Sequence, residues 1–327
     1  MYLAYFLASP LRNLPPKPKQ TAMKTFFISL LLVFSALSAS SQNTSSLERH
    51  WKKDVEKLRV ISYNILDGFG WGKKDTDRQE RLVAWIKGQD PEIVGLQELC
   101  GFNEQSLQVM ALRWGHPYAV ILKEGGYPVG ITSKRPITIR RKITEGIGHG
   151  LLHAQTYGYE VLVTHLNPHN ASKRHAEAAA IVTYIRENGL QRCILMGDMN
   201  SHSPMDADYM EGHATRLQAK YGGAESKNLL NGEFDYTTIS QYLSLPLIDV
   251  CRRYVAPASR LTYPTRILMS ESRHSEVRQL TAERLDYIFI SPDLESELVD
   301  AFIFNGADTD YLSDHYPIAM DLLVQHE

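Results

Sequence analysis

The chain has 327 residues, of which 43% are hydrophobic and 22% charged, and its formal net charge is −2. These values are typical of a globular protein and predict one large domain. The three cysteines, Cys100, Cys193 and Cys251, are too few and too far apart for a zinc site or a disulfide framework. We expect them to be small buried hydrophobic residues.

The first 40 residues differ from the rest, because they contain four basic residues and no acidic residue. Residues 23–40 fit a secretory signal peptide, with a charged start at Met23-Lys24, an apolar core over residues 26–37 and a small-residue cleavage site. Residues 1–22 are then expected to be an upstream extension, since a signal beginning at Met23 is complete. The apolar run is short for a membrane span. We expect a secreted or periplasmic protein, with a retained N-terminal anchor as the alternative.

Removal of residues 1–40 leaves 31 basic and 37 acidic residues, a net charge of −6. A protein that binds duplex nucleic acid mainly through its phosphates normally has a basic surface. The charge therefore disfavours nucleic acid as the partner without excluding it. We expect the mature chain to be a monomer without a stable membrane span.

The pattern along the chain predicts a linker over residues 41–56 and one folded domain over residues 57–327. Strands are expected at residues 58–65, 92–98, 118–122, 128–133, 137–143, 151–157, 160–165, 193–198, 284–290, 298–304 and 316–323, with a shorter one at 261–265. Helices are expected at residues 77–88, 103–114, 172–187, 205–220 and 236–243, and an exposed loop at 269–281. The alternation of strands and helices predicts an α/β fold.

The most informative stretch is the apolar run Cys193–Met196 with the sequence Gly197-Asp198-Met199-Asn200 that follows it. Such a run predicts a strand buried on both faces, and side chains two residues apart project to the same side. Asp198 and Asn200 are therefore expected to point together beyond the strand end, where α/β sheets place their ligands. Taken alone, the tetrapeptide is better explained as an Asx turn that closes the strand.

Other expected strand ends also carry polar side chains that can do chemistry. These are Asn64, Glu98, His165, Asp286, Asp314 and His315. Carboxylate and amide oxygens suit Mg²⁺, with Mn²⁺ as an alternative, better than zinc. An unperturbed histidine titrates at about pH 6.5 and can move a proton or neutralise an oxyanion. Together these groups predict metal-assisted attack of water on phosphorus.

Six motifs in order carry a resemblance to a known family. They are Ser62-Tyr63-Asn64, Leu96-Gln97-Glu98, Val163-Thr164-His165-Leu166, Gly197-Asp198-Met199-Asn200, Arg284-Leu285-Asp286-Tyr287 and Ser313-Asp314-His315-Tyr316-Pro317-Ile318. Over residues 57–325 the chain resembles the endonuclease/exonuclease/phosphatase superfamily, which includes pancreatic deoxyribonuclease, abasic-site endonucleases, neutral sphingomyelinases and inositol polyphosphate phosphatases. The resemblance implies a four-layer αββα sandwich, in which two mixed sheets are flanked by helices.

The resemblance also implies roles for the strand-end residues. Glu98 would be the main Mg²⁺ ligand, with Asn64 and Asp314 near it. On the catalytic side, Asp198 would align and activate the attacking water, and Asn200 would hold both Asp198 and a phosphate oxygen.

Two histidines complete the implied site. His315, oriented by Asp286, would contact the scissile phosphate. His165 would stabilise the developing charge or assist the leaving group. The ordinary alternative for Asp286 and His315 is a structural hydrogen bond, which is compatible with an orienting role.

Further polar residues near these motifs have ordinary explanations. Histidines at positions 149, 153, 169 and 175 are additional candidates, and solvent-facing side chains explain the last two equally well. We expect an exposed helix charge at Arg174, with a contact to a substrate phosphate as the alternative. Thr262 is expected to be a turn residue or a neighbour of the site, since Leu261-Thr262-Tyr263-Pro264 resembles a family segment beside the site.

The sequence thus predicts an exported Mg²⁺-dependent phosphoesterase that hydrolyses a phosphodiester in a small, nucleotide or lipid-linked substrate. One alternative is a secreted nuclease acting on DNA or RNA. Another is a catalytically idle binding module of the same fold, which the complete set of site residues disfavours.

Overall fold

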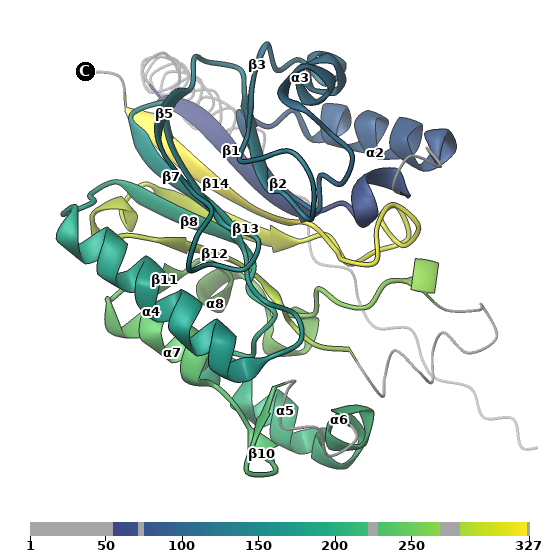
Figure 1. Ribbon diagram of the computed structural model, residues 1–327, viewed down its shortest axis with the longest axis vertical. Helices are drawn as coiled ribbons and strands as arrows, with labels where there is room; N and C mark the ends of the chain where they lie inside the picture. The colour runs from purple at the N-terminus through teal and green to yellow at the C-terminus, as the bar shows by residue number, and fades with distance from the viewer. Residues whose placement is uncertain (1–54, 71–74, 222–227, 269–281, 326–327) are drawn as a thin grey trace, which may run out of the picture. The chain divides into compact units, whose positions relative to one another are not determined.

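The computed structural model describes residues 55–70, 75–221, 228–268 and 282–325, which Figure 1 shows in colour. The predicted upstream extension, the signal peptide at 23–40, nearly all of the linker at 41–56 and the loop at 269–281 lie outside the described residues. Residues Glu56–Val324 form one compact unit. None of its described helices is long and apolar enough to cross a membrane.

Two six-stranded mixed sheets form the centre of this unit. The first sheet has the order β13-β14-β1-β2-β4-β3 and consists of β1 (Val55–Asn64), β2 (Ile93–Gln97), β3 (Tyr118–Ile121), β4 (Gly130–Ser133), β13 (Leu298–Ile303) and β14 (Ile318–Gln325). The second has the order β11-β12-β8-β7-β6-β5 and consists of β5 (Thr138–Ile143), β6 (Leu151–Thr156), β7 (Tyr159–His165), β8 (Cys193–Asp198), β11 (Ile248–Asp249) and β12 (Asp286–Ile290). β1 pairs in parallel with β2, and β7 in parallel with β8.

Helices cover the outer face of each sheet, as Figure 1 shows. On the first sheet lie α2 (Thr76–Gln89) and α3 (Glu104–Leu112), and on the second lie α4 (Ala171–Glu187) and α7 (Thr237–Ser244). The arrangement confirms the predicted four-layer αββα fold.

Three apolar clusters correspond to the three interfaces between these layers. In β8, Ile194 and Met196 belong to the cluster between the sheets, whereas Cys193 and Leu195 belong to the cluster beneath α4. This alternation is what a strand buried on both faces requires. Where the sheets approach, a Cβ on Gly95 of β2 would lie 2.8 Å from the sulfur of Met196, so glycine permits the close packing.

Most predicted elements are present, with shifts at their ends. The predicted linker is wrong at its end, because β1 already begins at Val55. The first predicted helix begins one residue early, at Thr76, because the Asp75 side chain accepts a hydrogen bond from the Arg78 N–H at 3.0 Å. The strand predicted over residues 261–265 is wrong, since only a single bridge joins Tyr263 to Glu283 there.

The single helix predicted over residues 205–220 is also wrong. The segment is divided into η2 (Pro204–Asp206), α5 (Ala207–Gly212) and α6 (Ala214–Tyr221). The break falls at His213, whose Nδ1 lies 2.8 Å from the carbonyl oxygen of Tyr209. The remaining short elements are η1 (Asp67–Phe69), β9 (Leu229–Leu230), β10 (Glu233–Phe234), α8 (Cys251–Tyr254), η3 (Pro257–Ser259), η4 (Arg266–Leu268) and η6 (Pro292–Leu294).

Candidate active site

The carboxyl ends of the two parallel strand pairs meet at one cavity. β1 and β2 end with Asn64 opposite Gln97, and β7 and β8 end with His165 opposite Asp198. Because β12 runs antiparallel to β8, its first residue, Asp286, also lies opposite Asp198. A cavity of about 430 Å³ opens at this edge.

All eight residues predicted for the site are at this cavity. Six of them line it, namely Glu98, His165, Asp198, Asn200, Asp314 and His315. The other two, Asn64 and Asp286, are buried behind the wall, where each hydrogen-bonds a lining residue. The structure therefore brings together side chains from six separate segments of the chain.

On the first sheet, Glu98 is the residue best placed to bind a cation. Its Oε1 accepts a hydrogen bond from Asn64 Nδ2 at 3.2 Å, and its Oε2 accepts one from the Asp67 N–H at 2.8 Å. Burial raises the pKa of the Glu98 carboxyl, the Asp67 N–H opposes this, and the charge of Asp314 raises it further. Glu98 also has φ = +61°, a conformation that costs a non-glycine residue about 1–3 kcal/mol.

Asp314 supplies a second carboxylate to this side of the cavity. The Ser313 hydroxyl oxygen lies 2.6 Å from the Asn64 carbonyl oxygen and 3.3 Å from Asp314 Oδ1, so it joins the segment before β14 to the end of β1. Two carboxylates facing one cavity repel each other, and a bound divalent cation removes that repulsion. The residues present therefore fit a hard cation such as Mg²⁺, with Glu98 and Asp314 as its oxygen ligands and Asn64 behind them.

On the second sheet, Asp198 is the centre of the hydrogen-bond network. Its Oδ1 accepts a hydrogen bond from the Asn200 N–H at 2.9 Å, and its Oδ2 accepts one from Asn64 Nδ2 at 3.1 Å. Burial raises the pKa of the Asp198 carboxyl, while the charge of His315 opposes the rise. The residue before Asp198 must be glycine, because a Cβ on Gly197, at its φ of +147°, would lie 1.9 Å from the Thr164 carbonyl oxygen of β7.

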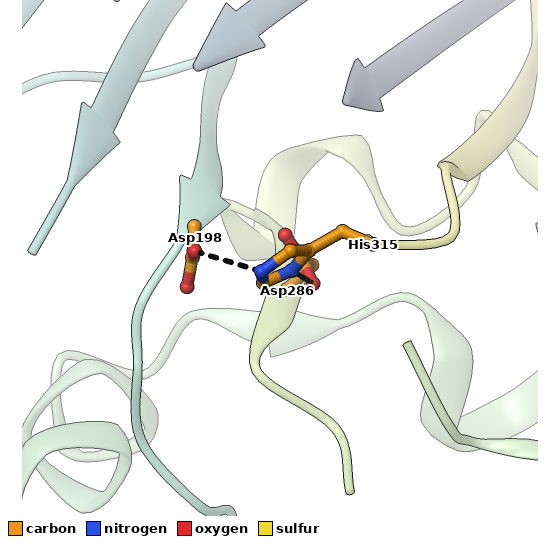
Figure 2. A group of neighbouring side chains, drawn as sticks. All are labelled: Asp198, Asp286 and His315. Carbon is orange, nitrogen blue, oxygen red and sulfur yellow. Dashed lines mark hydrogen bonds and ion pairs between the residues drawn. The ribbon is translucent and has the colours of Figure 1, made fainter. Parts of the chain in front are cut away.

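Figure 2 shows the His315 ring between two carboxylates. Its Nδ1 lies 2.8 Å from Asp286 Oδ2, and its Nε2 lies 3.7 Å from Asp198 Oδ2. Burial disfavours the charged ring, but Asp286, Asp198 and Asp314 together raise the pKa of His315 well above its usual value. The same three side chains are spaced closely enough to hold a metal ion. The hydrogen bond between Asp286 and His315 already pairs two of these side chains, so the arrangement fits an imidazolium better.

Asn200 and His165 occupy the other side of Asp198. Asn200 has φ = +48°, and its Nδ2 donates to the Leu166 carbonyl oxygen at 3.1 Å, so it is the Asn200 backbone rather than its amide that contacts Asp198. The ring of His165 is buried, with Nε2 3.5 Å from Asp198 Oδ2. Burial and the neighbouring His149 and His315 lower the pKa of His165 well below its usual value.

Several residues near the site differ from what the sequence indicated. His149 is half-buried: it lines the cavity and lies against the ring of His165. Arg174 is only 1% exposed and donates to Ser201 Oγ, which corrects the prediction of an exposed helix charge. His153 is likewise buried, and His175 lies 2.5 Å from an oxygen of Asp235.

Thr262 was predicted as a turn residue or a neighbour of the site, and the structure gives it a definite contact. Its buried hydroxyl accepts hydrogen bonds from the backbone N–H groups of Leu285 and Asp286 at 2.9 and 3.2 Å. The hydroxyl therefore fixes the start of β12, from which Asp286 reaches His315. Its signal in the sequence was the resemblance of Leu261-Thr262-Tyr263-Pro264 to a family segment beside the site.

Comparisons with known proteins agree with this geometry. A model of the Endonuclease/Exonuclease/phosphatase family matches residues 61–315. Among solved structures, an AP endonuclease from Archaeoglobus fulgidus has a TM-score of 0.59 and 18% identity, over 83% of this chain and 100% of that one. A 3′ phosphatase from Neisseria, NExo, bound to product DNA hairpin, has a TM-score of 0.60 and 18% identity, over 81% and 99%. No protein of curated function matches the chain.

Proposed function

We propose a reaction for this chain on the premise that it belongs to the endonuclease/exonuclease/phosphatase family and is a hydrolase of phosphoester bonds. The reaction is Mg²⁺-dependent hydrolysis of a phosphodiester, with water as the nucleophile. The observation that carries the proposal is the convergence of eight polar side chains on one cavity. Glu98 and Asp314 come from the first sheet, and His315, just before β14, joins that sheet to Asp198 and Asp286 of the second.

The protein's own groups account for the proton transfers. Asp198 accepts a proton from the attacking water as the new bond to phosphorus forms and the bond to the leaving oxygen breaks. His315, held by Asp286, carries a positive charge that stabilises the negative charge developing on the phosphate oxygens. His165 faces Asp198 as a neutral ring and assists departure of the leaving group.

Glu98 and Asp314 would hold a divalent cation, which when bound would supply Lewis-acid polarisation of the phosphate. Mg²⁺ is the proposed ion because both ligands are carboxylates, and Mn²⁺ has the same preference for oxygen. Glu98 is held ready for the ion by its hydrogen bonds from Asn64 and from the Asp67 N–H.

The charge of the cavity favours a small phosphodiester over a polyanion. Among the described residues that line it, five are carboxylates, Asp67, Glu98, Asp198, Glu283 and Asp314, and none is lysine or arginine. A substrate with several phosphates, or a nucleic-acid backbone, requires basic side chains along its length. One phosphate near one bound cation does not, which supports a nucleotide-sized or lipid-linked substrate.

We further propose that the enzyme is exported as a monomer. The support for export is the signal-like sequence of residues 23–40. A secreted nuclease is the second candidate, because the similar solved structures include an AP endonuclease and a phosphatase bound to DNA.

One experiment tests the reaction and separates these candidates. The purified protein is assayed with Mg²⁺ and then with a chelator, against bis-p-nitrophenyl phosphate, plasmid DNA, sphingomyelin and inositol phosphates. We expect cleavage of the small diester that the chelator abolishes and restored Mg²⁺ recovers. Activity that survives chelation would contradict the mechanism, nicking of plasmid DNA would favour the nuclease, and no turnover of any substrate would favour a binding module.

A further inference from the structure

The two histidines of the site are held in different ways. His315 is oriented through its second ring nitrogen, which bonds Asp286, as is usual for a working histidine. The second nitrogen of His165, Nδ1, is buried and has no hydrogen-bond partner within the described part of the chain. Within the described residues, no hydrogen bond to Nδ1 therefore orients the His165 ring in the way that Asp286 orients His315.

A ring contact takes the place of that hydrogen bond. The centroid of His149 lies 4.5 Å from that of His165, with 38° between the planes. On its other side His149 is 5.2 Å from the ring of Tyr127. All three rings line the cavity, so His149 is packed between a wall residue and a residue of the reacting centre.

Glu177 of α4 holds the two loops that carry these histidines. Its Oε1 accepts a hydrogen bond from the Gly148 N–H at 2.9 Å, next to His149, and its Oε2 accepts one from the Asn167 N–H at 2.8 Å, just after β7. The carboxylate is 4% exposed, and burial raises the pKa of Glu177. Burial of a carboxylate costs hydration free energy, and the hydrogen bonds from the two backbone N–H groups offset that cost. Because these N–H groups belong to different loops, the carboxylate fixes the spacing between the loops.

The backbone beside His149 is constrained as well. Gly150 has φ = +98°, and a Cβ there would lie 2.3 Å from Leu122 Cδ2 and 2.7 Å from the Ile143 carbonyl oxygen. The hydroxyl of Thr164, the residue before His165, donates to the Gly150 carbonyl oxygen at 2.9 Å. The loop thus has a fixed path along the end of β7.

We propose that His149 is a positioning residue for His165: its ring, held in place through Glu177, keeps the His165 imidazole turned so that Nε2 faces Asp198. The kinetic test of this inference rests on the proposed phosphodiesterase reaction. The NMR test described below does not depend on that reaction. Because ring packing supplies no negative charge, it orients His165 without raising the pKa of the ring, as a carboxylate on Nδ1 would do.

Two substitutions at position 149 test whether an aromatic ring is enough to orient His165. His149→Phe keeps a ring, and His149→Ala removes it. His213→Ala is the matched control, because His213 packs 4.3 Å from the ring of Tyr209 outside this cavity. Each is measured with Mg²⁺ and bis-p-nitrophenyl phosphate, alone and combined with His165→Ala.

We expect His149→Ala to lower kcat about 10-fold or more with little change in KM, as is typical when an orienting partner is lost. We expect His149→Phe and His213→Ala to stay within about threefold of the parent. In the His165→Ala background, removal of His149 should have no further effect on kcat. An equal loss in both backgrounds, or His149→Phe as impaired as His149→Ala, would overturn the proposal.

Nitrogen NMR of the histidine rings provides a readout independent of turnover. The His165 ring signals, assigned by their loss in His165→Ala, should broaden or shift in His149→Ala and stay in place in His149→Phe. Unchanged His165 signals in His149→Ala would refute the positioning role even if the protein hydrolysed none of the substrates. An inactive parent protein with the expected NMR changes would refute only the proposed reaction.

Discussion

The two parallel strand pairs have the same construction and different chemistry. In the first sheet, β1 and β2 are connected through α2; β1 ends in Asn64, and Glu98 directly follows β2. In the second, β7 and β8 are connected through α4 and end in His165 and Asp198. In the proposed reaction, the first pair would present an acid to a cation, and the second would present an acid and a ring for proton transfer. One type of strand–helix–strand unit, used twice, would then divide metal binding from water activation.

The two ends are linked by one side chain. Asn64 Nδ2 contacts both Glu98 Oε1, at 3.2 Å, and Asp198 Oδ2, at 3.1 Å. An amide N–H₂ group has two donors, so it can satisfy both acids at once. If the first strand pair binds the metal and the second activates water, substitutions in the two pairs should produce different kinetic defects.

The largest expected effect is at the end of β8. Asp198→Asn keeps the side-chain volume but removes the proton acceptor, and kcat should fall about 10³-fold. Added Mg²⁺ should not restore it, because the defect is not in metal binding. The thermal midpoint should stay equal or rise, since burial raises the pKa of Asp198 and so opposes its charge.

Asp308→Asn, which removes one exposed carboxylate, is the control for the change in charge. An Asp198→Asn enzyme with parental kcat would remove Asp198 from the reaction.

The corresponding substitution at the end of β2 should produce a defect that metal can repair. Glu98→Gln removes one anionic ligand, so half-saturation should need about 10- to 100-fold more Mg²⁺. A Mg²⁺ titration of the initial rate measures the shift, with Asp198→Asn beside it. If saturating Mg²⁺ recovers none of the lost rate, Glu98 belongs to the chemical step and the division between the two units is wrong.

A smaller effect is expected where β12 supports the second unit. Asp286 raises the pKa of His315, so Asp286→Asn lowers it and the charged ring is lost at a lower pH. The alkaline limb of the kcat profile should therefore move to lower pH, and the rate at pH 7 should fall about 10-fold or more. An unchanged alkaline limb would mean that His315 does not act as a cation.

The features of these two units that local sequence pattern marks were predicted, and the features that it does not mark were missed. Asp198 and Asn200 follow an apolar strand, and Glu98 and His165 occupy equivalent positions, so local pattern placed them at strand ends, and the family resemblance carried by the six motifs implied the four-layer fold and the eight candidate site residues. The break in the helix at His213 was missed, although a glycine, Gly212, directly precedes it and ends α5.

Other features depended on contacts between distant segments. Arg174 is buried because it meets Asn228 Oδ1 at 2.7 Å, 54 residues away, and nothing in the helix pattern indicates that partner. The Glu177 contacts with two loops are of the same kind. His149 could not be distinguished from an exposed histidine, since its environment is created by Tyr127 and His165 only after folding.

The smallest effect concerns stability and compares buried histidines in the two sheets. His116, beside the first sheet, is fully buried between the Thr132 hydroxyl and the Pro91 carbonyl oxygen, and burial lowers the pKa of its ring from 6.5 to about 4. His153, in the second sheet, is also buried, but Glu160 Oε2 lies 2.8 Å from its Nε2 and opposes the lowering of its pKa. The first sheet should therefore be the more sensitive to acid.

Between pH 6.5 and about 4 the unfolded chain binds a proton at His116 that the folded protein does not, so the free energy of unfolding should fall as the pH falls through this range. The contribution is complete above pH 6.5, and its loss approaches about 3 kcal/mol near pH 4. Urea unfolding at pH 7.5, 5.5 and 4.5 measures the free energy of unfolding at each pH. His116→Gln and His153→Gln are compared by the slope of this free energy against pH, because each substitution also changes stability at neutral pH. His116→Gln should flatten the pH dependence more than His153→Gln does; equal slopes would show that neither sheet dominates acid sensitivity.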